Sequence, residues 1–221
     1  MAGLTSSTIG RKYAMALSAM FLLLFLIMHL SVNLISVFSP SAFNSASEFM
    51  GYNPLIQFLM QPILGFAVIF HFVMGFVLEL KNRSARPVKY AMNNGSANST
   101  WMSRNMIISG LVVLAFLGLH MYDFWWHEIN FKYVEANIPD NERFWHELHA
   151  KFADAWRVIF YIIAFVLLGL HLAHGFQSSF QSVGARHPKY TPVIKALGTW
   201  YSILIPAGFI IIALYHFLTQ S

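Results

Sequence analysis

Five stretches of mainly apolar residues limit what this chain can fold into, because each is long enough to cross a lipid bilayer. A transmembrane helix needs about 20 such residues, and we predict helices over residues 13–38, 55–80, 104–126, 154–181 and 196–218. Charged residues make up only 10% of the chain and hydrophobic residues 57%, which leaves too little charge to cover a soluble fold. The sequence therefore predicts an all-α integral membrane protein, with a single membrane domain over residues 1–221.

The segments between these stretches contain residues that break helices. They are Ser39-Pro40-Ser41, Asn53-Pro54, Asn93-Asn94-Gly95, Ile138-Pro139-Asp140 and His187-Pro188. The longest segment, residues 127–153, is expected to form an outer loop. Arg11 and Lys12 precede the first stretch as in a signal peptide, but the stretch far exceeds the roughly 7–15 apolar residues of such a peptide. We therefore expect it to be a retained helix.

Basic residues are distributed unequally between the two sides of the predicted helices. With a cytoplasmic N-terminus, the cytoplasmic side would hold Arg11, Lys12, Lys81, Arg83, Arg86, Lys89, Arg104, Arg186, Lys189 and Lys195. The outer side would hold only Lys132, Arg143, Lys151 and Arg157. Cytoplasmic loops of membrane proteins carry the excess of Lys and Arg, so we expect the N-terminus inside and the C-terminus outside. The basic residues that give the chain its net charge of +5 thus serve to orient it in the membrane. No nucleic-acid partner is expected.

The absence of cysteine narrows the metal chemistry that this chain can support. It excludes disulfides, thiolate-bound iron–sulfur clusters, zinc–cysteine sites and covalent attachment of a c-type haem. Histidine is therefore the residue to examine for a metal or cofactor site.

Four predicted helices each contain a deeply placed histidine: His29, His71, His120 and His171. Ionisable side chains inside a bilayer are costly and indicate functional sites. Each histidine lies roughly 24–27 Å along its helix from the end at which the chain enters. Because odd and even helices run in opposite directions, His29 and His120 meet in an outer layer, and His71 and His171 meet roughly 13 Å nearer the cytoplasm. Two such layers match two stacked b-type haems, each with two axial imidazoles.

A repeated H-x-x-x-G pattern supports this interpretation. It occurs as His71-Phe-Val-Met-Gly75 and as His171-Leu-Ala-His-Gly175. A glycine four residues on lies beneath the imidazole on the same helix face, where its missing side chain would let a macrocycle approach the backbone. One copy alone would favour ordinary small-residue helix packing. The sequence leaves His174 open as an alternative ligand or as a hydrogen-bond donor to a propionate or a neighbouring helix, and an interhelical hydrogen bond is expected for His216.

The chain resembles the single-subunit, five-helix, dihaem cytochrome b anchor of bacterial, menaquinone-linked succinate dehydrogenases and fumarate reductases. The resemblance covers nearly the whole chain, and it is carried by His29-Leu-Ser-Val-Asn33, Ala42-Phe-Asn-Ser-Ala46, Phe49-Met50, Ile69-Phe-His71 with Gly75, Leu119-His120, and His171 with Gly175. It implies that His29 and His120 bind the distal haem b, and that His71 and His171 bind the proximal haem b. Proximal here means nearer to the cytoplasmic catalytic subunits.

The resemblance also implies partners and a location. Succinate oxidation needs a flavin, and onward transfer of single electrons needs iron–sulfur centres, but this sequence has no Rossmann glycine fingerprint and no cysteine. A flavoprotein subunit and an iron–sulfur subunit are therefore expected on the cytoplasmic face. The expected location is the bacterial inner membrane, and the expected electron acceptor is menaquinone.

Gly169 marks a departure from some members of that family. They carry a glutamate at this position, two residues before the fourth-helix ligand, and that glutamate is proposed to return protons across the membrane. With glycine here, we expect that electrons move outward and that protons for menaquinone reduction come from outside. Succinate oxidation would then draw on the membrane potential.

A quinone site is expected near the outer surface, beside an acidic group that exchanges protons. Glu48 is the first candidate because it lies in the first outer segment, and Asp123 is the second because it follows His120 by three residues. For each, the alternative is a solvated acid at the membrane interface.

The outer segment also contains His146-Glu-Leu-His149, with His127 nearby. This is one residue short of the H-E-x-x-H pattern of zinc proteases. A solvated amphipathic connection is favoured over a zinc site.

Two other functions are open from the sequence. The first is a cytochrome b anchor of a hydrogenase or formate dehydrogenase, which also uses membrane histidines. The second is a transporter whose histidines relay protons, although the H-x-x-x-G repeat relates helices that run in the same direction, unlike an inverted transporter repeat.

Overall fold

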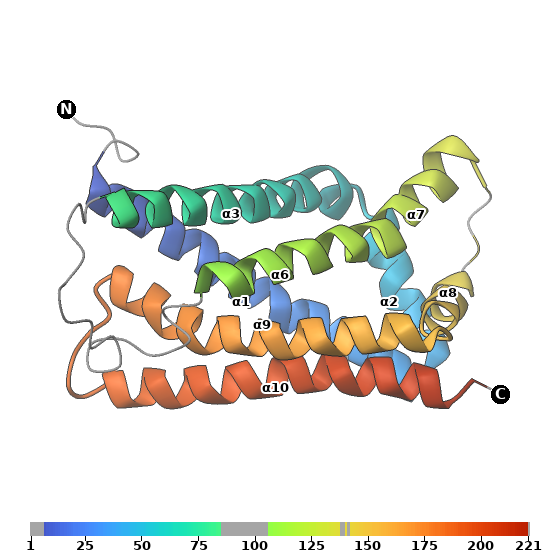
Figure 1. Cartoon of the computed structure of the whole chain (residues 1–221). Coiled ribbons are helices and arrows are strands. Elements are labelled where there is room, and N and C mark those ends of the chain that lie inside the picture. Colours follow the sequence, from blue (N-terminus) through green and yellow to red (C-terminus); the bar gives the residue numbers. More distant parts are fainter. Residues whose placement is uncertain (1–6, 85–105, 138–139, 141, 221) are drawn as a thin grey trace.

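Five long helices make up most of the protein, shown in Figure 1 as a computed structural model that describes residues 7–84, 106–137, 140 and 142–220. Three begin or end close to prediction: α1 (Thr8–Phe38), α9 (Ala155–Ser182) and α10 (Thr191–Leu218). The second runs over Ile56–Ser84, as the π-helical segment η1 (Ile56–Met60) and α3 (Gln61–Ser84), and the third runs over Met106–Val134. All five are long and apolar enough to cross a membrane. The described residues form no β-strand, so the chain is an all-helical, multi-pass membrane protein.

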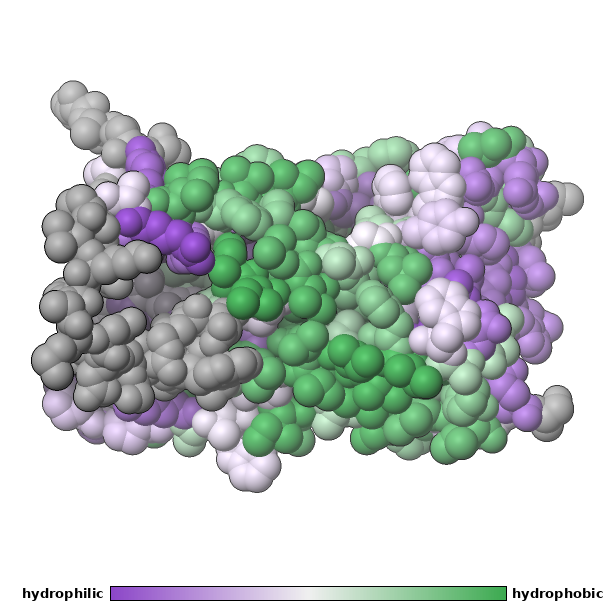
Figure 2. Space-filling view, viewed as in Figure 1, coloured by the Kyte–Doolittle hydropathy of each residue, from purple (hydrophilic) through white to green (hydrophobic). Residues whose placement is uncertain are grey.

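The long helices lie side by side along one axis, so the bundle has two distinct ends (Figure 1). We call the end that carries α2, α7, α8 and the C-terminus the α8 end. Figure 2 shows hydrophobic residues across the middle of the visible face and hydrophilic residues gathered at the α8 end. Arg86, Lys89, Arg104 and the breaker residues Asn93-Asn94-Gly95, Ile138 and Pro139 lie outside the described residues.

The segment expected to break the first helix does so at Ser39, and it also begins a new helix. This helix, α2 (Pro40–Tyr52), has Ser39 as its N-cap, whose side chain accepts a hydrogen bond from the Ala42 N–H at 3.2 Å. Proline is favoured in the first turn of a helix because it lacks the N–H that would be unbonded there. Ser39-Pro40 therefore turns the chain and starts α2 across the α8 end.

The third long helix extends beyond its predicted end at residue 126. It consists of α6 (Met106–His120), the π-helical segment η2 (Met121–Trp126), α7 (His127–Ile129) and the π-helical segment η3 (Asn130–Val134). Its charged side chains are paired: Lys132 donates to the Gly51 carbonyl at 2.6 Å and lies 2.6 Å from Glu128. These contacts stabilise the polar end of the third long helix, residues 127–134.

The predicted outer loop, residues 127–153, also contains a second helix, α8 (Arg143–Lys151). Arg143 is buried and bonds both Glu128 and Glu147, which fastens α8 to the third long helix. Burial alone would lower the pKa of Arg143, but the hydrogen bonds and charges of the two glutamates raise it above its ordinary value. The predicted outer loop is therefore helical over much of its length, and ion pairs between α8 and the third long helix order it.

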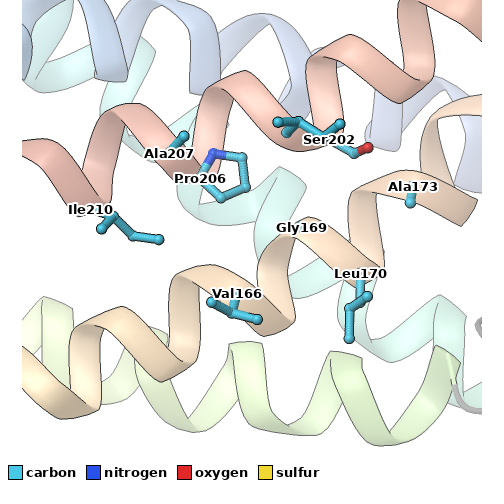
Figure 3. A pocket seen from close by; sticks show the side chains of 9 residues that line it. Val166, Gly169, Leu170, Ala173, Ser202, Pro206, Ala207 and Ile210 are labelled. Atoms are coloured by element: carbon cyan, nitrogen blue, oxygen red, sulfur yellow. The ribbon is translucent and has the colours of Figure 1, made fainter.

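The most closely packed part of the bundle lies between α9 and α10, where most of the buried apolar residues are found. Gly169 and Pro206 face one another there, at a hollow shown in Figure 3. A Cβ on Gly169 would lie 3.0 Å from the Ser202 carbonyl oxygen and 3.3 Å from Pro206 Cγ. Pro206 has no N–H to bond that carbonyl, four residues earlier. The close approach of two helices therefore explains the glycine at this position.

Candidate functional site

Two pairs of histidines face each other inside the bundle. His29 on α1 and His120 on α6 have ring centroids 5.7 Å apart, and His71 on α3 and His171 on α9 have ring centroids 6.5 Å apart. All four side chains are half-buried. The structure thus brings together the two pairs that helix depth predicts, and in each pair the two histidines come from different helices.

Serine hydroxyls orient both members of the His71–His171 pair. Ser18 on α1 lies 3.3 Å from His71 Nδ1, and Ser109 on α6 lies 3.3 Å from His171 Nδ1. Each hydroxyl already donates its proton to a backbone carbonyl, that of Met15 at 2.8 Å and that of Met106 at 2.9 Å. The serine oxygens must therefore accept from Nδ1–H, which leaves each Nε2 with a free lone pair, the form that binds a metal.

The two histidines of the His29–His120 pair differ in what surrounds their Nδ1 atoms. The Asn33 side chain, one turn beyond His29, donates to the His29 carbonyl at 2.8 Å and lies 3.4 Å from His29 Nδ1. His120 Nδ1 is buried and has no hydrogen-bond partner among the described residues. Aromatic rings surround the pair, with Phe25 stacked on His29 and Phe116 stacked on His120.

The two pairs stand at different heights. Ser18, which contacts His71, precedes His29 by eleven residues on α1, and Ser109, which contacts His171, precedes His120 by eleven residues on the third long helix. At about 1.5 Å per residue, each helix gives a separation of roughly 16 Å. The His29–His120 pair lies toward the α8 end, and we call it the upper pair; the His71–His171 pair is the lower pair.

The residues of both pairs fit a b-type haem in number, kind and spacing. Each pair brings two imidazoles from different helices together, with ring centroids 6.5 Å and 5.7 Å apart. These histidines would hold the haem iron through their ring nitrogens. Within the described ranges, no group of three or more His, Cys, Asp and Glu side chains could hold a metal ion. A haem iron needs only two protein ligands, since the porphyrin supplies the other four nitrogens.

An internal repeat connects the residues of the two pairs. Met15, Ser18 and His29 on the first long helix have the same spacing as Met106, Ser109 and His120 on the third. Each methionine lies over the glycine of an H-x-x-x-G motif, because a Cβ on Gly75 would meet Met15 Cε at 3.6 Å and one on Gly175 would meet Met106 Cε at 3.5 Å. The sequence analysis missed both serines and this repeat, although the repeated spacing M-x-x-S followed by histidine is visible in the sequence.

Gly75 and Gly175 are not required by packing among the described residues. The methionine contacts that a Cβ would make are ordinary van der Waals distances. His174 is half-buried on α9, and it makes no hydrogen bond or ring contact with the described residues. The structure thus gives these three residues no packing or hydrogen-bonding role of their own.

The two acidic candidates have very different surroundings. Glu48, on α2, is half-buried and makes no hydrogen bond or ion pair with the described residues. Asp123 is 1% exposed and lies one turn beyond His120 in the π-helical segment η2. Its Oδ2 accepts a hydrogen bond from the Tyr161 hydroxyl at 2.9 Å and lies 3.3 Å from Arg157 Nε.

The other carboxylate oxygen of Asp123 is buried without a hydrogen bond. The cationic group nearest to it is Lys151 Nζ, at 3.9 Å. Asp123 therefore has an unused hydrogen-bond acceptor in a buried position beside the upper pair. Tyr161 and Arg157 were not predicted, because they approach Asp123 only through the packing of α9 against the third long helix.

No protein-family model, curated protein or solved structure matches this chain. The fold and the site define a helical, multi-pass membrane protein with two stacked histidine pairs in its interior.

Proposed function

We propose that the chain is the cytochrome b membrane anchor of a succinate:quinone oxidoreductase and carries electrons through two b-type haems to menaquinone. The upper pair, His29 and His120, would hold the distal haem, and the lower pair, His71 and His171, the proximal haem. When bound, the haems supply one-electron redox chemistry. The residues of the chain bind and orient them and set the protonation of their surroundings.

The lower pair is the observation that carries this proposal. Its two imidazoles come from different helices, have centroids 6.5 Å apart, and are both held by serines in the form with a free Nε2 lone pair. An ordinary interhelical hydrogen bond would not require both rings to be oriented in the same way. Two such pairs, stacked roughly 16 Å apart, suit electron transfer along the membrane normal better than a proton relay.

Glycines at residues 75 and 175 add support. Because the surrounding side chains leave room for a Cβ at both positions, helix packing does not explain the glycines. Close approach of a porphyrin to the backbone would explain them. His174, three residues beyond His171, is then suited to contact the edge of the proximal haem.

Orientation follows from the charges. We infer that the α8 end faces outside, because the basic excess predicted for the cytoplasm lies at the opposite end, where Lys81, Arg186 and Lys189 are found. The flavoprotein and iron–sulfur subunits would bind at that opposite end. Menaquinone would bind near the distal haem at the α8 end.

Asp123 is the better candidate for proton exchange with the quinone. It is buried beside the upper pair and contacts Tyr161 and Arg157, whereas Glu48 has no polar partner among the described residues. Replacing Glu48 by Gln tests the other assignment: quinone turnover should then stay normal, with both haems retained.

Spectroscopy of the purified membrane protein tests the proposal directly. We expect a reduced b-type α-band and two haems per chain, and His71→Ala or His171→Ala should each remove one haem while the other remains. His187→Ala is a matched control, because His187 is exposed and lies far from both pairs. A stoichiometry of two haems in His71→Ala, with an unchanged spectrum, contradicts the proposal.

Co-purified subunits test the identity of the complex. A covalent-flavin protein and an iron–sulfur protein are expected. A nickel or molybdopterin protein would instead indicate a hydrogenase or formate dehydrogenase anchor, and the absence of any b-type α-band would favour a transporter.

A further inference from the structure

A third pair of histidines, outside the two haem pairs, lies at the α8 end. His216 near the end of α10 is fully buried, and its Nδ1 lies 3.1 Å from Nδ1 of His149 on α8. Its Nε2 lies 2.9 Å from the Ser36 hydroxyl on α1. His216 thus makes the expected interhelical bond, but with two helices at once. We call His149 and His216 the outer histidine pair.

The hydrogen bonds of this pair have a single direction. Ser36 donates its hydroxyl proton to the Asn33 carbonyl at 2.6 Å, so its oxygen accepts from His216 Nε2–H. His216 Nδ1 is then an acceptor, and it must receive Nδ1–H from His149. The donors therefore point inward from α8 to α1, and the remaining nitrogen of His149, Nε2, is the lone pair at which a proton can enter.

The chain of hydrogen bonds ends at a group that cannot pass a proton on. Its last acceptor is the Asn33 backbone carbonyl, which has no proton to release. A proton that enters at His149 is therefore stored on the pair. Asn33 also contacts His29 at 3.4 Å, and Ser36 lies seven residues beyond His29, roughly 10 Å along the same helix. The stored charge would thus lie close to the upper pair.

The surroundings favour a pair that is neutral until a nearby negative charge appears. Trp145 stacks on His149 at 4.6 Å, and Phe152 stacks on His216 at 6.4 Å. The titratable neighbours are His146 on α8 and Tyr215 on α10. No carboxylate among the described residues forms an ion pair with either histidine.

The charged residues of α8 are engaged elsewhere. Arg143 and Glu147 belong to the cluster with Glu128, and Lys151 faces Asp123. From α1, only the hydroxyl of Ser36 faces the pair. The Gln220 side chain donates to the carbonyls of His149 and His216 at 2.7 Å each, which fixes the backbone of both.

We propose that the outer histidine pair is a proton-binding site that takes up one proton from the α8-end solution for each electron that reaches the His29–His120 site. This inference rests on the proposed function, since it needs a haem at the upper pair. The electron comes from the iron–sulfur partner by way of the lower site, and it leaves to the quinone. The proton forms an N–H bond at His149 Nε2 on reduction, and that bond breaks on reoxidation, when the proton returns to the outer solution.

Redox titration of the distal haem at several pH values tests this proposal without an activity assay. The purified full-length, haem-loaded protein is titrated between pH 6 and 8.5, and the distal haem is identified as the signal lost in His120→Ala. In the wild type, the midpoint potential should fall by up to about 59 mV per pH unit, the value for one proton per electron. In His149→Gln, which removes the nitrogen that takes up the proton, the potential should become nearly independent of pH.

Two further variants keep the result interpretable. His216→Gln keeps a donor for Ser36, an acceptor for His149 and the lone pair of His149 Nε2, so its potential should still fall with pH. His127→Gln is the matched control, because His127 is exposed at the same end and pairs with Glu147; it should keep the wild-type slope. A wild-type potential that does not change with pH, or equal slopes in the wild type and His149→Gln, overturns the inference. Absence of haem from the wild type would instead overturn the proposed function.

Discussion

Ser18 and Ser109 allow a quantitative test of how the lower pair is held. Each accepts a hydrogen bond from a histidine Nδ1 at 3.3 Å. A ligand imidazole that donates Nδ1–H is a stronger base and stabilises the oxidised iron. Ser18→Ala or Ser109→Ala should therefore raise the midpoint potential of the proximal haem.

The size of the shift follows from the hydrogen bond. A neutral hydrogen bond contributes about 0.5–1.5 kcal/mol, and at 3.3 Å the lower half of that range applies. A tenfold change in an equilibrium constant corresponds to about 1.36 kcal/mol, or to about 59 mV for a one-electron couple. A free-energy change of about 0.5–1 kcal/mol is therefore equivalent to a shift of roughly 20–40 mV in the midpoint potential. Because the serines contact different histidines, the double variant should shift the potential by roughly 40–80 mV.

Potentiometric titration of both haems in the same sample measures this effect. Ser31→Ala is the control, because Ser31 is exposed on α1 and bonds only the Ile27 carbonyl of its own helix. The distal potential should not change in any of these variants. A shift confined to the distal haem, or none in either haem with both serines removed, would refute the assignment of Nδ1–H to Ser18 and Ser109.

Three further predictions concern other parts of the bundle. Gly169→Glu should lower the free energy of unfolding by about 1–3 kcal/mol, and with it the melting temperature, because its Cβ would lie 3.0 Å from the Ser202 carbonyl oxygen. An unchanged melting curve would show that α9 and α10 separate easily. Asp123→Asn should impair menaquinone reduction in steady-state assays while haem content stays at two, and Tyr161→Phe should have a smaller effect; normal turnover in Asp123→Asn removes Asp123 from the quinone site. Burial and the neighbouring His146 lower the pKa of His149 below its ordinary value of 6.5. The unfolded chain therefore binds this proton first, so the melting temperature of the oxidised protein should fall as the pH drops below about 6.5, and His149→Gln should reduce that fall.

The parts of the fold that depend on local sequence could be predicted. The five spans follow from the length of each apolar stretch, and the equal depth of His29 and His120 follows from the fixed rise per residue in two helices that run in the same direction. The extension of the third helix to Val134 could not be predicted, because it depends on Lys132 meeting Gly51, 81 residues earlier in the chain. The same is true of the contact between His149 and His216, 67 residues apart in sequence.

The start of α2 and the serines of the lower pair are a different case. Their signals were present in the sequence: proline after an N-cap serine is typical of a helix start, and Met15–His29 repeats the spacing of Met106–His120. Neither could be given a role without knowing which helices are neighbours. The hydroxyl of Ser18 has meaning only once His71, on another helix, is seen 3.3 Å away.

The shared spacing of residues 15–29 and 106–120 gives the first and third long helices the same serine contact to the lower pair, but their surroundings differ at the upper pair. Four residues beyond the histidine, the first helix has Asn33, beside His29 Nδ1, and the third has Phe124, which leaves His120 Nδ1 unbonded. If the upper pair binds a haem as proposed, the missing hydrogen bond would make His120 a weaker base and the upper site the stronger oxidant, so electrons would move downhill toward the α8 end.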